Sequence, residues 1–140
     1  MNSEEIVLPR KLTNQLLHLA QASPDNEICG LIGADSNGKP VNCYPIDNSA
    51  EMPSNRFLLD AAQQIAAMRQ MRERGESLFA IYHSHPNAPA VPSNTDIEQA
   101  GYPDALHLII SLSTKGVLEM RGFEIADQRV KELTLTLVET

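Results

Sequence analysis

The chain of 140 residues contains no tryptophan, and its only cysteines are Cys29 and Cys43. Two cysteines are too few for the disulfide framework of a small secreted protein, and no Cys-x-x-Cys pair indicates a thiolate metal site. We interpret each cysteine as a small buried apolar residue on a strand. Because aromatic residues make up only 4% of the chain, the core is expected to consist mainly of aliphatic side chains and methionine.

Positive charge is also scarce, since 11 Lys and Arg stand against 18 Asp and Glu. Nucleic acids and anionic membranes bind basic faces, so neither is expected as a partner. The N-terminal segment lacks the apolar stretch of a secretory signal, and no apolar run approaches the roughly 20 residues of a spanning helix. We therefore expect a cytoplasmic protein whose residues 1–140 form a single domain.

The pattern of apolar residues and turn signals predicts an α/β domain with a mixed sheet flanked by helices. Helices are expected over 9–22 and 60–74, and a short third helix is expected to open at Ser93. Strands are expected over 27–34, 40–46, 77–85, 106–112, 117–125 and 130–138. Asn37-Gly38 is typical of a hairpin turn, Asp60 of a helix cap and Gly75 of a helix end. In the last strand, Leu133, Leu135 and Leu137 are expected on one buried face.

The stretch AIYHSHPNAPAVPSNTDIEQA, residues 80–100, contains two of the four histidines in the chain. Side chains alternate along a strand, so His83 and His85 point the same way with Cα atoms about 6.5–7 Å apart. Two imidazoles placed in this way can converge on one small cation. Ser84 points to the opposite face, where it is expected only to pack or form a hydrogen bond.

Ser93 and Asp96 occupy the positions of a helix start in which the serine hydroxyl caps the backbone N–H of the aspartate. The seven residues 86–92 include three prolines and can turn the chain back, so that Asp96 faces the two histidines. Two His nitrogens and one carboxylate oxygen leave a fourth tetrahedral position open, which is typical of a catalytic rather than a structural zinc site.

A hydrolytic zinc site also needs a general base. The upstream carboxylates are Asp25, Glu27, Asp35 and Glu51. Glu27 stands out because it opens a buried strand, where an unpartnered carboxylate is unfavourable; the alternative is an ordinary glutamate at the exposed start of a strand. We interpret His107 as a structural histidine rather than a third imidazole ligand, since Asp96 completes the set.

The pattern formed by His83, Ser84, His85, seven residues, Ser93, two residues and Asp96 resembles the signature of the JAMM (MPN+) metallopeptidases. The segment EICGLIG resembles the upstream segment of that family, whose glutamate corresponds to Glu27, and the similarity runs from about Leu8 to Ile125. The resemblance implies a cytidine-deaminase-like fold and one zinc ion per chain, held by His83, His85 and Asp96. It further implies that Glu27 is the general base and that Ser93 stabilises the oxyanion.

Members of this family hydrolyse amide or isopeptide bonds after the C-terminal Gly-Gly of ubiquitin or ubiquitin-like proteins. This compact chain has little room for the insertions of the eukaryotic members and resembles the minimal prokaryotic branch, some of whose members process sulfur-carrier proteins. The resemblance therefore implies a zinc metallopeptidase acting on such a carrier. The alternatives are a non-catalytic scaffold, which usually lacks one or more ligands that this chain has, and an amidase acting on a different peptide.

Overall fold

The computed structural model describes residues 5–113 and 118–139. In chain order its elements are β1 (Glu5–Pro9), α1 (Arg10–Gln21), β2 (Cys29–Ala34), β3 (Pro40–Ile46), α2 (Ala61–Glu73), β4 (Ser77–His85), α3 (Asn94–Glu98), β5 (Leu106–Ser111), β6 (Glu119–Ala126) and β7 (Arg129–Val138). The predicted α/β class is confirmed, and the predicted elements are found within about two residues. Residue 117, where the fifth predicted strand begins, lies outside the described residues.

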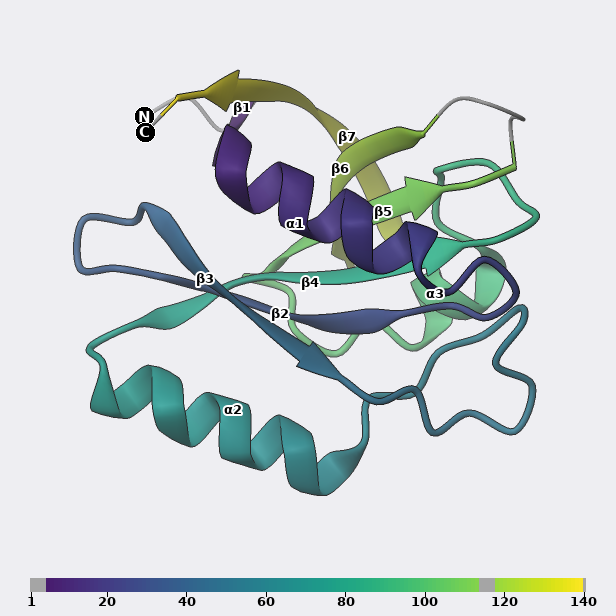
Figure 1. The fold of residues 1–140 in the computed structure, drawn as a ribbon, viewed down its shortest axis with the longest axis horizontal. Coiled ribbons are helices and arrows are strands. Elements are labelled where there is room, and N and C mark those ends of the chain that lie inside the picture. The colour runs from purple at the N-terminus through teal and green to yellow at the C-terminus, as the bar shows by residue number, and fades with distance from the viewer. Residues whose placement is uncertain (1–4, 114–117, 140) are drawn as a thin grey trace.

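The strands form one mixed sheet of seven in the order β1-β7-β6-β5-β4-β2-β3 (Figure 1). β1 pairs with β7 and β4 with β5 in parallel, and the remaining pairs are antiparallel. β4 lies between β5 and β2, and its last six residues are all buried, as its nearly continuous apolar sequence predicts.

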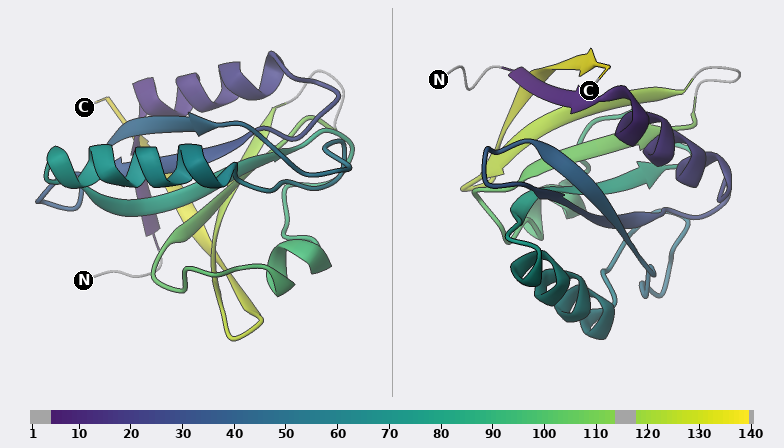
Figure 2. Two further views of the ribbon diagram at one scale, coloured as in Figure 1. Left: turned by 90° about the horizontal axis from the view of Figure 1, so that it is seen from below. Right: turned by 60° about the vertical axis from the view of Figure 1, so that its left-hand side comes forward.

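The two longer helices cover opposite faces of the sheet (Figures 1 and 2). Leu12 and Leu16 of α1 pack against one face in a cluster that includes Tyr82. Met71 of α2 packs against the other face in a cluster that includes Ile81, the strand neighbour of Tyr82. A third cluster packs α3 onto the sheet through Ile97 and Ile109. Since side chains alternate along β4, the odd-numbered residues 81, 83 and 85 share the face covered by α2 and α3.

Turn chemistry sets the ends of several elements. The Asp60 carboxylate accepts a hydrogen bond from the Gln63 backbone N–H and caps α2, and Gly75 beyond its last turn has a φ of +72°. In the β2–β3 hairpin, Gly38 has a φ of +79° and the Asp35 carboxylate accepts from two backbone N–H groups. These predicted signals are confirmed.

Two features of the sheet differ from the expectation. β1 was not predicted, because a strand of five residues between a short N-terminal segment and a helix carries little pattern; its pairing with β7 buries Ile6 and Leu8. Leu137 was expected to be buried, but its side chain is 40% exposed. Within the described residues, β7 pairs with β6 as far as Leu133, and beyond that point its paired neighbour is β1.

Within residues 5–113 and 118–139, the structure contains no helix that is both long and apolar enough to cross a lipid bilayer.

Candidate metal and catalytic site

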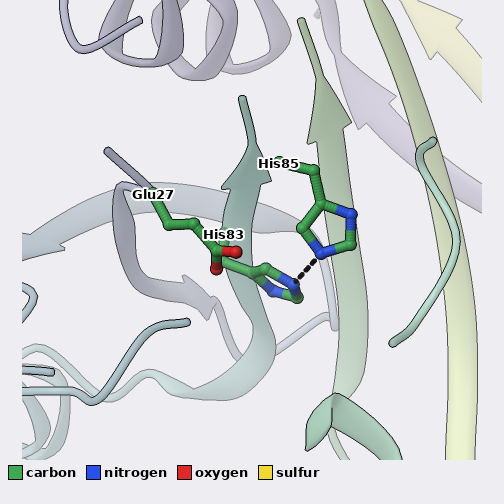
Figure 3. Close-up of side chains that lie close together, drawn as sticks. All are labelled: Glu27, His83 and His85. Carbon is green, nitrogen blue, oxygen red and sulfur yellow. Dashed lines mark hydrogen bonds between the residues drawn. The ribbon is translucent and has the colours of Figure 1, made fainter. Parts of the chain in front are cut away.

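His83 and His85 lie at the C-terminal end of β4, and both side chains are buried. They share one face of the strand, as predicted, and their Nε2 atoms lie 3.1 Å apart (Figure 3). Ser84 points to the other face, where its hydroxyl accepts a hydrogen bond from the Ile28 backbone N–H at 2.9 Å. This bond attaches the segment that precedes β2 to the end of β4.

Asp96 reaches the two histidines from α3. Its Oδ2 atom lies 3.1 Å from Nε2 of His83 and 3.2 Å from Nε2 of His85, and the side chain is only 8% exposed. The same oxygen accepts a hydrogen bond from the Ser93 backbone N–H, while the Ser93 hydroxyl accepts one from the Asp96 backbone N–H. This reciprocal capping fixes the carboxylate in the first turn of the helix. Nε2 of His83, Nε2 of His85 and Oδ2 of Asp96 thus form a nearly equilateral triangle of potential ligand atoms.

The second ring nitrogen of each histidine has a different environment. Nδ1 of His85 donates a hydrogen bond to the Pro89 carbonyl at 2.8 Å, so in the neutral ring Nε2 carries no proton. Among the described residues, Nδ1 of His83 has no hydrogen-bond partner, and the ring is instead stacked on Phe57 with centroids 4.3 Å apart. Both rings are thus held with Nε2 directed toward Asp96.

The loop that positions His85 is itself anchored to the sheet. The Ser111 hydroxyl, at the end of β5, donates a hydrogen bond to the Ala88 carbonyl at 2.7 Å, one residue before Pro89. Phe57 and Ser111 were not identified from the sequence. Neither residue belongs to a recognisable sequence motif. Phe57 reaches His83 through the conformation of its loop, and Ser111 lies beside His85 through the register of β4 with β5.

Glu27 precedes β2 by two residues, so it does not open the strand as predicted, but it is 5% exposed and therefore buried. Its backbone N–H donates to the Pro53 carbonyl, and its own carbonyl accepts from the Asn48 side chain. Cys29 pairs with His83 in the antiparallel register of β2 and β4, and Glu27 is two residues earlier, on the same face. One carboxylate oxygen of Glu27 and one nitrogen of each site histidine lie within 4.8 Å of one another.

Burial and the contacts between the site residues together set the pKa values of the site. It raises the pKa of Glu27 to about 7, with a lowering contribution from His85 and a raising one from Asp96. Burial also lowers the pKa of His83. Burial alone would raise the pKa of Asp96, but the close contacts of its carboxylate with His83 and His85 outweigh that effect and hold the pKa below its usual range. At neutral pH the cluster therefore offers an ionised carboxylate beside a neutral imidazole.

This donor set fits a metal ion. If neither Nε2 carries a proton, two nitrogen lone pairs and a carboxylate oxygen face one another in a buried space, and a cation held by all three relieves the repulsion. The Oε1 atom of Glu27 is buried without a hydrogen-bond partner among the described residues, as expected for a carboxylate whose partner is a water or a substrate group. Two His nitrogens and one carboxylate oxygen are a donor set typical of open, hydrolytic metal sites.

His107 lies on the same face of the sheet but farther from the site along the strands. Its register partner on β4 is Ile81, not either site histidine. Its side chain is buried, and burial lowers its pKa to about 4. This placement agrees with the interpretation of His107 as a histidine outside the ligand set.

Comparisons with known proteins identify the family of the chain. The family model described as prokaryotic homologs of the JAB domain matches residues 9–124. A CysO-cysteine peptidase of Mycobacterium tuberculosis is 30% identical over 135 residues, which cover 96% of this chain and 92% of that protein. A probable TtuB-protein conjugate cleaving protease of Thermus thermophilus is 41% identical over 122 residues, covering 86% and 80%.

Solved structures share the fold. A protein from Desulfitobacterium hafniense has a TM-score of 0.85 at 32% identity, covering 96% of this chain and 93% of that one. A JAB1/MPN domain protein from Archaeoglobus fulgidus has a TM-score of 0.57 at 18% identity, covering 96% and 100%. The chain belongs to the prokaryotic JAB-domain family, and the resemblance to the JAMM metallopeptidases is confirmed.

Proposed function

We propose that the protein is a zinc metallopeptidase that hydrolyses the amide bond after the C-terminal Gly-Gly of a ubiquitin-like or sulfur-carrier protein. Two relatives support this substrate class, since one is named for the cysteine adduct of CysO and the other for protein conjugates of TtuB. The single observation that carries the proposal is the triangle of ligand atoms, 3.1–3.2 Å on each side, with a buried glutamate beside it.

His83, His85 and Asp96 would hold one zinc ion per chain. Two imidazoles and a carboxylate suit zinc better than a hard ion that prefers oxygen ligands. When bound by these residues, zinc would supply Lewis acidity, which would favour deprotonation of a water molecule near neutral pH and polarise the scissile carbonyl.

Glu27 acts as the general base. Its pKa of about 7 lets it accept a proton from the attacking water at physiological pH and pass that proton to the leaving amine nitrogen. An amine is a poor leaving group until it is protonated, so this transfer is essential for cleavage. Burial serves the role because it raises the proton affinity of the carboxylate and limits its contact with solvent.

Ser93 caps α3 and also stabilises the oxyanion. Its hydroxyl oxygen accepts from the Asp96 backbone N–H, which uses a lone pair and leaves the hydroxyl hydrogen available to donate. A donor fixed beside a ligand of the metal is well placed for the negative charge that develops on the carbonyl oxygen.

The whole chain, residues 1–140, works as one catalytic domain.

The test uses purified protein with a measured zinc content and a small ubiquitin-like carrier whose Gly-Gly is extended by a short peptide. Mass spectrometry is expected to show a product that ends in Gly-Gly. Zinc-loaded protein that binds such conjugates across a panel of carriers but never cuts them would identify a scaffold instead. Cleavage of unrelated peptides with carriers left intact would identify a different amidase.

A further inference from the structure

A cavity of about 300 Å³ opens directly beside the metal site. His83 and Asp96 form one end of it, whereas neither Glu27 nor His85 is among the described residues that line it. Its walls come from the segment before α2, from β4 and β5, and from the segment after α3. The proposed function uses none of these wall residues.

The walls of the cavity are mainly apolar. Phe57, Leu58, Leu59, Ile81, Ala100 and Tyr102 contribute most of the aliphatic and aromatic surface. The polar side-chain groups outside the metal site, among the described residues that line the cavity, are those of Gln64, Gln99 and His107 and the Tyr102 hydroxyl. Amides are neutral, and burial lowers the pKa of His107 to about 4, so these groups carry no charge at neutral pH. Away from the metal-site end, a charged group entering the cavity would lose water without gaining an ion partner.

The position of Glu27 indicates which part of the substrate reaches the cavity. Glu27 returns a proton to the leaving amine, so the leaving group must lie on the side of the site that Glu27 occupies. The cavity shares His83 and Asp96 with the site but does not include Glu27. It therefore opens toward the acyl side of the scissile bond, where the carrier tail lies.

The spacing of residues along an extended tail indicates which of its side chains can reach the cavity. The two glycines next to the scissile bond have no side chains, and an extended chain advances about 3.3 Å per residue with alternating faces. The third residue from the end of the tail is the first to carry a side chain, and it projects to the same face as the last glycine, about 6.5–7 Å farther on. An apolar cavity of about 150 Å³ can hold a benzene molecule, so this one has room for a whole aliphatic or aromatic side chain.

We propose that this cavity binds the side chain immediately before the Gly-Gly of the carrier tail and selects an uncharged, apolar side chain there. The inference rests on the proposed function. Leu58 supports it, because this leucine lines the cavity and yet is 56% exposed, as expected of an apolar group that a substrate covers. The rim is braced by a hydrogen bond of 2.8 Å from the Gln64 side chain to the Tyr102 hydroxyl, which joins α2 to the segment after α3.

The experiment uses one carrier protein whose tail ends in Xaa-Gly-Gly and is extended by four residues, with Leu, Ala, Asp or Lys at Xaa. The Leu tail is expected to have a kcat/KM about tenfold above that of the Ala tail, because it fills the cavity. It should exceed the Asp and Lys tails by about a hundredfold, because each of these would bury an unpaired charge.

Introducing a positive charge into the cavity wall tests whether the cavity is the source of the selectivity. Leu58→Lys is expected to raise kcat/KM for the Asp tail at least tenfold relative to the Leu tail. Ile65→Lys is the matched control, since Ile65 is a 62% exposed aliphatic residue of α2 that does not line the cavity. It should leave the ratio between the two tails unchanged within about twofold.

The outcomes separate the inference from the proposed function. If all four tails are cut at equal rates, the cavity assignment is overturned while the peptidase assignment stands. If no tail is cut, the peptidase assignment fails. The cavity assignment is then tested by NMR titration with product peptides that end in Leu-Gly-Gly or Asp-Gly-Gly. Chemical-shift changes at Leu58, Tyr102 and His107 that only the Leu peptide causes would support the cavity assignment. Equal changes with both peptides, or no changes with either, would refute it.

Discussion

Replacing Glu27 with glutamine tests both the chemistry and the energetics of the site. The substitution keeps the size of the side chain but removes its ability to ionise or to accept a proton. The pKa of this carboxyl is raised from 4.5 to about 7, chiefly by burial, so the folded protein disfavours the ionised form. At neutral pH the wild-type protein therefore folds against an electrostatic penalty that the variant lacks.

The penalty can be bounded from the size of the shift. Each pKa unit corresponds to about 1.4 kcal/mol, so the full shift amounts to roughly 3 kcal/mol. Partial access of water to the site and the need to accommodate a buried amide reduce this gain, and we expect about 1–2 kcal/mol. Because the folded pKa is the higher one, the penalty is absent below pH 4.5, grows as the pH rises toward 7 and is complete above it.

The assay compares urea denaturation of metal-free wild-type protein and Glu27→Gln at pH 4, 5.5, 7 and 8. The variant is expected to gain stability relative to wild type as the pH rises. Glu51→Gln is the matched control, since it removes a carboxylate at an exposed loop position instead of a buried one.

The same variant also tests catalysis. Zinc-loaded Glu27→Gln should retain its metal and its affinity for a carrier conjugate but lose about a hundredfold or more in rate. Wild-type activity should fall at acid pH as Glu27 becomes protonated, and Glu51→Gln should follow the wild-type profile. A stability difference that is flat between pH 4 and 8 would refute the burial argument, and a Glu27→Gln variant as fast as wild type would remove Glu27 as the base.

Three further predictions concern the metal and the cap of α3. His83→Ala and Asp96→Ala should each abolish zinc binding in elemental analysis, while His18→Ala, which removes an exposed histidine of α1, should keep full occupancy; retained zinc in both site variants would disprove the ligand assignment. Removal of zinc by a chelator should leave the circular dichroism spectrum and cooperative melting in place, because the three apolar clusters include none of the ligands; a disordered metal-free chain would contradict this. Ser93→Ala should cost about 0.5–2 kcal/mol of stability through loss of the cap and, in addition, about a hundredfold in rate; a lower melting temperature with unchanged turnover would restrict Ser93 to the cap.

Much of the site could be predicted from the sequence because its main features are local. The alternation of side chains along a strand places His83 and His85 on one face, and a serine three residues before an aspartate specifies a helix start. The same local rules predicted the hairpin at Asn37-Gly38 and the end of α2 at Gly75. The motif also identified the family, because its spacing reflects how far a short proline-containing loop can reach from a strand to a helix.

Other features follow from contacts between distant parts of the chain. β1 is held by β7, more than 120 residues away, and Leu137 is exposed because β6 ends its pairing at Leu133. Glu27 reaches the histidines through the register of β2 with β4, although a carboxylate in that sequence position could equally lie on the surface.

The class of fold, the candidate metal ligands and the helix caps could be predicted from the sequence, since these depend on neighbouring residues and on the periodicity of single elements. Packing between elements was needed to bring the three candidate ligand atoms to within 3.1–3.2 Å of one another, to bury Glu27 beside them and to form the adjoining apolar cavity. The reason is physical: hydrogen-bonding and rotamer preferences act within a few residues, whereas burial, the pKa shifts it causes and the shape of a cavity exist only once several elements pack together.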